Sequence, residues 1–273
     1  MRKLTLGNGI MHSILIFLGI LTVVPLIMMV LISFKDTYQF NMNRWTLTFP
    51  LHFENYSEAW VAIRGYISNS FIISGVTVVG VMVISCMAAY PLARMRFFLK
   101  EQIYFLIISL LMIPGILTMV PLYSLIIDLG FINTWMGVWG PYIAGGQIFC
   151  IFVLRSFFSS LSEEMFEAAR MDGAGEIRVL VSLVVPLSKP IIGTLAVLNV
   201  LSTWNEFVLP IMVLNKIELQ PIPVGLLSIG TKFANDYGSL FAGYVIASLP
   251  LLILFALASK QFVEGLASGS VKL

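Results

Sequence analysis

Charged residues are scarce in this chain. Asp, Glu, Lys and Arg make up 11% of its 273 residues, and the formal net charge is only +2. Soluble domains carry about 25% charged residues, so this chain has too few to cover a water-facing surface. A net charge this close to zero also gives no reason to expect a basic surface that binds nucleic acid. Because 59% of the residues are hydrophobic, we predict an integral membrane protein.

Cysteine and histidine are nearly absent, with two of each. Cys86 and Cys150 both fall inside apolar runs, where a thiol behaves as a small hydrophobe. Two such cysteines form neither a disulfide framework nor a metal site. His12 and His52 stand far apart without companion ligands, so we expect no metal on this chain.

Catalytic motifs are missing as well. The phosphate-binding pattern G-x-x-x-x-G-K-[ST] does not occur in the sequence. Gly145-Gly-Gln147 lies in an apolar run, which favours close helix packing. The sequence offers neither a nucleophile–base arrangement nor a carboxylate pair. We therefore predict that this chain is not an enzyme by itself and binds no cofactor.

Long apolar runs are what the sequence has instead. A helix needs about 20 residues to cross a bilayer, and six runs reach that length. The first run is too long for a signal peptide and lacks a small-residue cleavage site, which indicates a true span. Because no repeat, low-complexity tract or linker interrupts the chain, we expect one all-α membrane domain over residues 1–273. The predicted spans lie near residues 10–34, 67–93, 103–127, 134–154, 191–214 and 240–259.

The basic residues predict the orientation of these spans. With both termini in the cytoplasm, 11 of the 16 Lys and Arg residues fall inside and 5 fall outside. The reversed topology would place the excess outside. We therefore predict cytoplasmic termini, outside loops near residues 35–66 and 215–239, and a long cytoplasmic segment at about 155–190.

Several predicted spans contain a proline, which frees a backbone carbonyl in the helix. Simple kinking and a break beside a translocation path both remain open for these positions. The prolines are Pro25, Pro114, Pro121, Pro210 and Pro250.

A short amphipathic helix is predicted inside the cytoplasmic segment, at about residues 161–172. Ser160 or Ser162 can cap its first turn, and Ser160 followed by Glu163 has the spacing of a capping box. Acidic residues in that first turn are favoured by the helix dipole. Gly173 stands where helices often end in the left-handed conformation.

The two faces of this predicted helix differ in polarity. An apolar stripe recurs at i, i+4, i+7 and i+8, and the opposite face places Glu167 and Arg170 where they can pair. Asp172 projects on the apolar side in the last turn, where the dipole disfavours an anion by about 0.3–1 kcal/mol. It should therefore have a partner, such as Arg178 or a residue of another chain. The stripe consists of Leu161, Met165, Ala168 and Ala169.

A second helical stretch over residues 176–185 is predicted to stop at Pro186, and Lys189-Pro190 is predicted to open the fifth span. From these residues alone, a membrane-surface helix pair that closes a loop is favoured, because amphipathic interfacial helices are common. That alternative stays open at this level.

One carboxylate, Glu206, lies inside the fifth predicted span, toward its outer side. Intramembrane ionisable groups cost about 2.5–3.5 kcal/mol on insertion scales and usually face a bundle interior or a cavity. Polar residues at i, i+3, i+4 and i+7 form a stripe that either lines a solute path or contacts another subunit. The candidate path residues are Asn199, Ser202, Thr203, Asn205 and Glu206.

Glu167-Ala-Ala, Gly173 and Leu183-x-Val-Pro186 together resemble the EAA signature of ABC-importer membrane subunits, EAA-x3-G-x9-I-x-L-P. The spacing matches in full, with Leu and Val in place of the usual Ile and Leu. Other segments resemble the carbohydrate branch, specifically its maltose-type second permease, although Ser162 stands where that family often has proline. These segments are Pro121–Tyr123, Leu129–Thr134, Trp204–Pro210, Ile222–Leu226 and Phe262–Leu266.

The resemblance implies a multi-subunit sugar importer in a bacterial or archaeal cell membrane. This chain would be its membrane permease, paired with a second, different permease. Two cytoplasmic ATPase subunits would bind ATP and Mg²⁺, and an extracytoplasmic solute-binding protein would deliver the sugar. In that family the EAA helix is the coupling helix. Its residues here, which would transmit ATPase closure to the spans, are Glu167, Ala168, Ala169, Asp172 and Gly173.

Two alternatives share part of this pattern. An ABC importer for a non-sugar solute would carry the same EAA signature, although the Trp204-Asn-Glu206 segment favours sugar. An ion-coupled secondary transporter predicts inverted repeats and discontinuous helices, and the sequence indicates neither.

Overall fold

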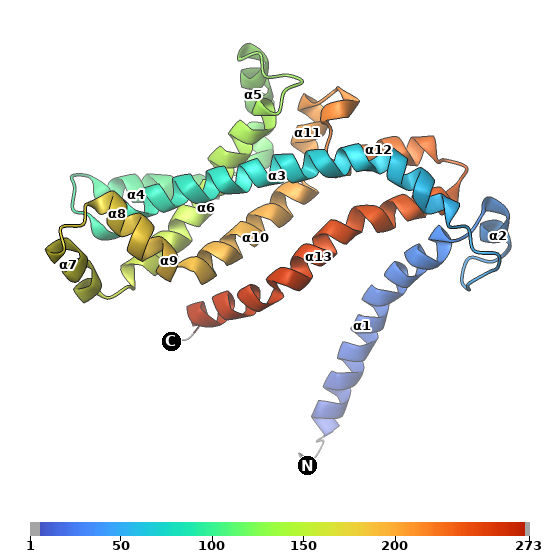
Figure 1. Ribbon diagram of the computed structural model, residues 1–273, viewed down its shortest axis with the longest axis horizontal. Helices are drawn as coiled ribbons and strands as arrows, with labels where there is room; N and C mark the ends of the chain where they lie inside the picture. Colours follow the sequence, from blue (N-terminus) through green and yellow to red (C-terminus); the bar gives the residue numbers. More distant parts are fainter. Residues whose placement is uncertain (1–5, 271–273) are drawn as a thin grey trace. The chain divides into compact units, whose positions relative to one another are not determined.

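The computed structural model describes the backbone of residues 6–270 and the side chains of residues 11–257 (Figure 1). Within residues 6–270 the chain is helical through most of its length and contains no strand. The predicted all-α class is therefore confirmed. Three basic residues that enter the predicted orientation, Arg2, Lys3 and Lys272, lie outside the described residues.

The helices follow one another with short connections. In chain order they are α1 (Leu6–Ser33), α2 (Thr37–Met42), α3 (Glu54–Arg94), α4 (Lys100–Ser109), η1 (Leu110–Met112), α5 (Gly115–Asp128), α6 (Met136–Ser159), α7 (Glu163–Met171), α8 (Glu176–Val179), η2 (Leu180–Val184), α9 (Val185–Leu187), α10 (Lys189–Asn205), α11 (Val208–Val213), η3 (Ile217–Leu219), α12 (Ile222–Lys232) and α13 (Tyr237–Ser270).

Four segments in the described part of the chain are long and apolar enough to cross a membrane singly: Met11–Ser33, Glu54–Arg94, Met136–Ser159 and Tyr237–Leu257. Two bent helix pairs raise the number to as many as six if each pair is one span. A multi-pass membrane protein is thus confirmed, and a count of six remains a prediction.

The helix α3 begins well before the predicted second span. Residues 54–66 were expected to belong to an outside loop, but α3 already starts at Glu54. The early part is amphipathic, because Asn55, Ala59 and Ile63 recur at i, i+4 and i+8 and are buried. The other expected outside loop, residues 215–239, likewise contains the helix α12.

Two of the predicted spans are broken rather than continuous. The helices α4 and α5 meet at 99°, because Pro114 disfavours helical geometry at the residue before it and Ile113 is extended there. The predicted span 191–214 is interrupted at Glu206, which is also extended and separates α10 from α11. Discontinuous helices therefore occur although the sequence did not indicate them. In contrast, Pro25, Pro121 and Pro250 lie inside continuous helices.

The chain forms two compact units. The first comprises the chain up to Gly65 together with Gly225–Pro250. In it, Asn55 Nδ2 donates to the carbonyl oxygens of Ser33 and Lys35, both at 2.9 Å. The buried Lys35 amine donates to the carbonyl oxygen of Asn43, and burial lowers the pKa of this amine. Along residues 11–27 of α1 every side chain is exposed, as expected of a lipid-facing helix.

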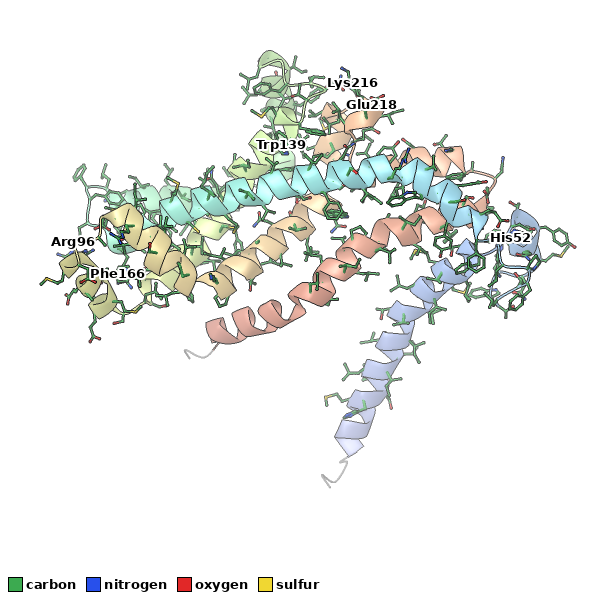
Figure 2. All side chains as sticks on the ribbon, in the orientation of Figure 1. His52, Arg96, Trp139, Phe166, Lys216 and Glu218 are labelled. Carbon is green, nitrogen blue, oxygen red and sulfur yellow. The ribbon has the colours of Figure 1, made fainter. Side chains whose placement is uncertain are left out.

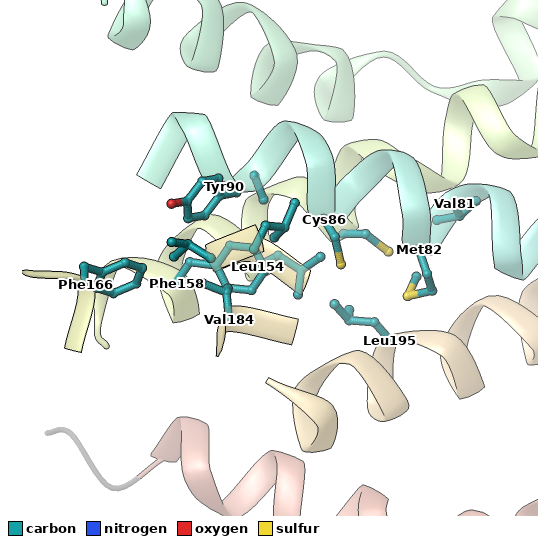
Figure 3. Packing of buried hydrophobic residues seen from close by; sticks show 13 residues of the cluster. Val81, Met82, Cys86, Tyr90, Leu154, Phe158, Phe166, Val184 and Leu195 are labelled. Atoms are coloured by element: carbon teal, nitrogen blue, oxygen red, sulfur yellow. The ribbon is translucent and has the colours of Figure 1, made fainter. Parts of the chain in front are cut away.

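The second unit comprises Tyr66–Val224 and the residues from Leu251 onward. Its larger apolar cluster joins α3, α6, α7, α10 and the α8–η2 segment, with Leu154 and Phe158 fully buried (Figure 3). A smaller cluster joins α3, α5, α6 and α11 around Val138 and Val213. Asn69 of α3 donates to the carbonyl oxygens of Glu218 and Gln220, which fastens the segment around η3 to α3; Lys216 and Glu218 of this segment are labelled in Figure 2.

The larger cluster gives a direct test of packing. Replacing Phe158, which is fully buried, with alanine is expected to lower the free energy of unfolding by about 3–5 kcal/mol, the usual cost of a large cavity. The matched control is Phe152→Ala on the same helix, because Phe152 is 40% exposed and leaves no enclosed void. Thermal unfolding in detergent checks both, and equal stability losses would contradict the assigned core.

Candidate functional site

The helix α7 occupies the predicted amphipathic segment and ends as expected. Gly173 has φ +73°, a conformation that glycine adopts without strain. The N–H of Gly173 donates to the carbonyl of Arg170, and the N–H of Ala174 donates to that of Ala169, both at 3.0 Å. These bonds satisfy carbonyl groups that a helix end leaves free.

The start of α7 differs from the prediction. Ser162 is the residue that caps the helix, and it makes no side-chain capping bond. The Ser160 hydroxyl instead donates to the carbonyl oxygen of Phe157 at 2.7 Å. The expected capping box is therefore wrong, because the Glu163 carboxylate turns away to bind Arg94 at 2.7 Å.

One face of α7 packs against the rest of its unit through Phe166, which is only 1% exposed. Leu161, Met165 and Ala169 are half-buried, whereas Ala168 of the predicted stripe is exposed. Phe166 anchors this helix, although it was not among the predicted stripe residues. Its signal was available, since Phe166 is the one aromatic residue within α7.

The opposite face of α7 is open. Glu167, Ala168, Asp172 and Gly173 are exposed, and among residues 11–257 no ion pair involves either acidic residue. The expected pairing of Glu167 with Arg170 is wrong. The expected partner of Asp172 within this chain, Arg178, is not engaged either.

Arg94, the last residue of α3, binds three segments at once. Its Nε donates to the carbonyl oxygen of Phe158 at 2.9 Å, and its terminal nitrogens donate to the Leu161 carbonyl and the Glu163 carboxylate. The guanidinium carbon lies 4.2 Å from the centroid of the Phe166 ring. Hydrogen bonds to charged groups are worth about 1.5–3 kcal/mol each, so this contact fixes the start of α7.

A second set of contacts fixes the end of α7. Arg170 lies 3.5 Å from Glu163 and 3.7 Å from Glu176, and the Tyr90 hydroxyl of α3 donates to the Glu176 carboxylate. We call this closed circuit the α3–α7 ring. It consists of Arg94, Glu163, Arg170, Glu176 and Tyr90.

The segment after α7 bends sharply before the next long helix. It runs as α8, the π-helical η2 and α9, and it continues through Pro186 to Leu187 rather than stopping at the proline. The bend between Leu187 and Lys189 is 80°. As predicted, Lys189 and Pro190 begin the following helix, α10.

A cavity of about 430 Å³ lies among α5, α6 and α10, within the size range of small-molecule sites. Four of the five candidate path residues line it, and neither lysine nor arginine does. The fifth, Asn205, is exposed outside the cavity, and its side chain donates to the Leu201 carbonyl at 2.7 Å. The polar residues lining the cavity are Thr118, Tyr142, Asn199, Ser202, Thr203 and Glu206.

Some polar side chains of the cavity already have hydrogen-bond partners within the chain, and others do not. Asn199 Nδ2 donates to the carbonyl of Leu195 at 2.9 Å, and the Thr203 hydroxyl donates to the carbonyl of Asn199 at 2.8 Å. Glu206 accepts from the N–H of Val208 at 3.0 Å. Tyr142 lines the cavity, and its buried hydroxyl has no hydrogen-bond partner among the described residues.

Sequence reasoning missed Thr118 and Tyr142 as cavity residues. Both lie on helices remote in sequence from the stripe on α10, and no spacing rule within one helix connects them. Gly146 was correctly associated with close packing: a Cβ there would lie 2.8 Å from Asn199 Oδ1 and 3.0 Å from Val81 Cγ2. At Gly145, a Cβ would meet nothing within 4 Å.

The fold and these two features define a class of protein: a multi-pass helical membrane protein with a polar cavity between helices and a short helix presenting an open face. A family described as "Binding-protein-dependent transport system inner membrane component" matches residues 80–266. The chain belongs to this family.

Relatives cover almost all of the chain. The probable ABC transporter permease protein YurM of Bacillus subtilis is 38% identical over 274 residues, covering 99% of this chain and 91% of that protein. The diacetylchitobiose uptake system permease protein NgcG of Streptomyces coelicolor is 31% identical, covering 97% and 89%. The melibiose/raffinose/stachyose import permease protein MelC of Bacillus subtilis is 33% identical, covering 84% of each. The resemblance to ABC-importer permeases is confirmed.

A solved structure has the same fold. A chain from a crystal structure of a bacterial ABC transporter involved in the import of the acidic polysaccharide alginate superimposes with a TM-score of 0.84. The match covers 96% of this chain and 98% of that chain at 21% identity. At that identity the likeness establishes the helical permease fold.

Gly146 and Gly145 provide a matched pair beside the cavity. Gly146→Ala is expected to lower the free energy of unfolding by about 1–3 kcal/mol, because overpacking forces neighbouring side chains to shift. Gly145→Ala should leave stability unchanged or raise it by up to about 1 kcal/mol, because the added Cβ meets no clash and alanine favours the helix interior over glycine. Thermal unfolding of the two purified variants checks this, and a stable Gly146→Ala variant would contradict the helix spacing described above.

Proposed function

We propose that this chain is a membrane permease subunit of an ATP-driven sugar importer. It pairs with a second, different permease, and two ATPase subunits bind from the cytoplasm and supply ATP hydrolysis. A solute-binding protein delivers the sugar from outside, and both termini of this chain face the cytoplasm. Family membership supports the transport role, and the sugar-named relatives NgcG and MelC support the solute class.

The residues that line the cavity support the proposed solute class more directly than family membership does. Its polar lining consists of hydroxyl and amide groups with one carboxylate, Glu206. Hydroxyl-rich solutes match such a lining, because each sugar hydroxyl both donates and accepts hydrogen bonds. An acidic sugar would meet Glu206 with no lining cation to offset the repulsion. We therefore propose an uncharged sugar as the solute.

The open face of α7 is the proposed docking surface for an ATPase subunit. Glu167, Ala168, Asp172 and Gly173 are exposed on it, and Ala169 lies at its edge, half-buried. Small residues allow close approach of another backbone, and the unpaired carboxylates offer partners for cations of the ATPase. Closure of the ATPases on ATP would move α7 and switch the cavity between inward-facing and outward-facing states.

Gly173 and Gly175 test this docking surface. Gly173→Ala introduces a Cβ at φ +73°, which costs about 1–2 kcal/mol for an L-residue and alters the end of α7. Uptake by the reconstituted complex is expected to fall at least about fivefold, the lower end of ordinary coupling energies. Asp172→Arg, which reverses an exposed charge, should act in the same direction.

The matched control is Gly175→Ala. Gly175 has an ordinary φ of −71° and open space around it, so its substitution should leave uptake unchanged. Membrane insertion is measured by the yield of folded chain. Normal uptake in both Gly173→Ala and Asp172→Arg would rule out α7 as the coupling helix.

Tyr142 and Glu206 test the cavity. Tyr142→Phe removes a hydroxyl that has no partner among the described residues, so thermal stability should not fall. Uptake should fall about two- to tenfold, as expected for one lost hydrogen bond worth about 0.5–1.5 kcal/mol. Glu206→Gln should likewise alter uptake more than it alters assembly. Loss of the assembled complex with unchanged uptake per remaining complex would instead make this stripe a subunit contact.

A further inference from the structure

The α3–α7 ring attaches the exposed helix to a span that is distant from it in sequence. The covalent neighbours of α7 are α6 on one side and the α8–α9 segment leading to α10 on the other. The ring adds α3, because Arg94 holds the first residue of α7 and Tyr90 holds Glu176 just beyond its end. The first residue of α7 and the first residue of α8 are therefore fastened to the last two turns of α3, and Arg170 near the end of α7 lies 3.7 Å from the same Glu176.

The contacts of Arg94 are more extensive than a helix cap requires. The carbonyl oxygens of Phe158 and Leu161 alone would satisfy a cation at the end of α6. The same guanidinium also binds Glu163 and lies over the buried ring of Phe166. Its side chain is 9% exposed, so this charge is withdrawn from water and depends on these partners.

The helix α3 continues from the ring to the wall of the cavity. At Gly80 an added Cβ would lie 2.6 Å from Ile143 Cδ1, and Val81 lies against Gly146. The Ser85 hydroxyl donates to the carbonyl of Gln147 at 3.4 Å. These contacts join α3 to the same part of α6 that carries Tyr142 and Gly146 into the cavity.

We infer that Arg94 and Tyr90 are positioning residues that make α3 and α7 move as one body, so that a pull on α7 reaches the cavity wall through α3. This inference rests on the proposed function, since it needs a partner that moves α7. Tightly packed elements transmit such motion as rigid bodies. The route is therefore a second mechanical connection beside the covalent one through α10.

The first experiment measures sugar taken up per ATP hydrolysed in the reconstituted complex. Arg94→Gln and Tyr90→Phe are expected to lower this ratio at least about fivefold, which corresponds to an ordinary coupling energy, while ATP hydrolysis continues. Arg94→Lys keeps the charge but loses the planar fork, and should restore part of the ratio. The control is Arg96→Gln, which removes an exposed charge from the same turn and should leave the ratio unchanged.

The second experiment measures whether α3 and α7 move together. Spin labels are attached to cysteines introduced by Met87→Cys in α3 and Met171→Cys in α7, at positions where the native side chains are 62% and 88% exposed. The background is a transport-competent variant in which Cys86 and Cys150 have been replaced. The mean distance between the labels should be the same with and without ATP. In the Arg94→Gln variant the distribution of distances should become broader.

A label distance that changes with ATP in the otherwise unaltered protein would overturn the inference. So would a normal uptake-to-ATP ratio in assembled Arg94→Gln and Tyr90→Phe complexes. If the Arg94→Gln complex does not assemble, the inference is tested by the uptake-to-ATP ratio of the conservative Tyr90→Phe and Glu176→Gln variants and by the ATP dependence of the label distance in the otherwise unaltered protein. Failure of the proposed function has a separate signature, because the wild-type complex would then show no ATP-driven sugar uptake at all.

Discussion

The need of every backbone N–H and C=O for a hydrogen-bond partner in lipid governs this structure. It explains why the described chain is built from helices, and it limits where helices can break. The two breaks within predicted spans, at Pro114 and at Glu206, both adjoin the cavity, since Gly115 and Glu206 line it. At the second break the Glu206 carboxylate accepts from the N–H of Val208. The side chain that marks the cavity thus also satisfies the backbone that forms it.

The same unit handles charge in two ways. Around Arg94, opposite charges and carbonyl oxygens surround a nearly buried guanidinium, which gives a rigid junction between α3, α6 and α7. On the far face of α7, Glu167 and Asp172 remain exposed without ion pairs in the described chain. A helix with one fixed face and one unpaired face is suited to receive a force from a partner and pass it inward. In contrast, the polar groups around the cavity are mostly neutral, which suits the sugar path proposed above.

Much of the architecture could be predicted from the sequence, because hydrophobic run length and glycine conformation are local properties. The positions of the apolar helices, the end of α7 at Gly173 and the stripe on α10 follow from spacing alone. What spacing could not supply was the pairing between distant segments. Glu163 has capping-box spacing from Ser160, but its carboxylate forms an ion pair with the Arg94 guanidinium instead of accepting a backbone N–H at the start of the helix. Tyr142 joins the stripe only because α6 packs on α10. The early start of α3 was missed because residues 54–66 are amphipathic rather than uniformly apolar.

The π-helical segment η2 has a consequence for how this chain can vary in length. A π-helical turn holds one residue more than the α-helical turn that it replaces. Loss of one residue within Leu180–Val184 would therefore convert this turn to α-helix without cutting the connection between α7 and α10. The segments on both sides would keep their relative orientation, because the extra residue is accommodated within the π-helical turn itself. A one-residue insertion or deletion can therefore be tolerated in this turn without reorienting α7 relative to α10.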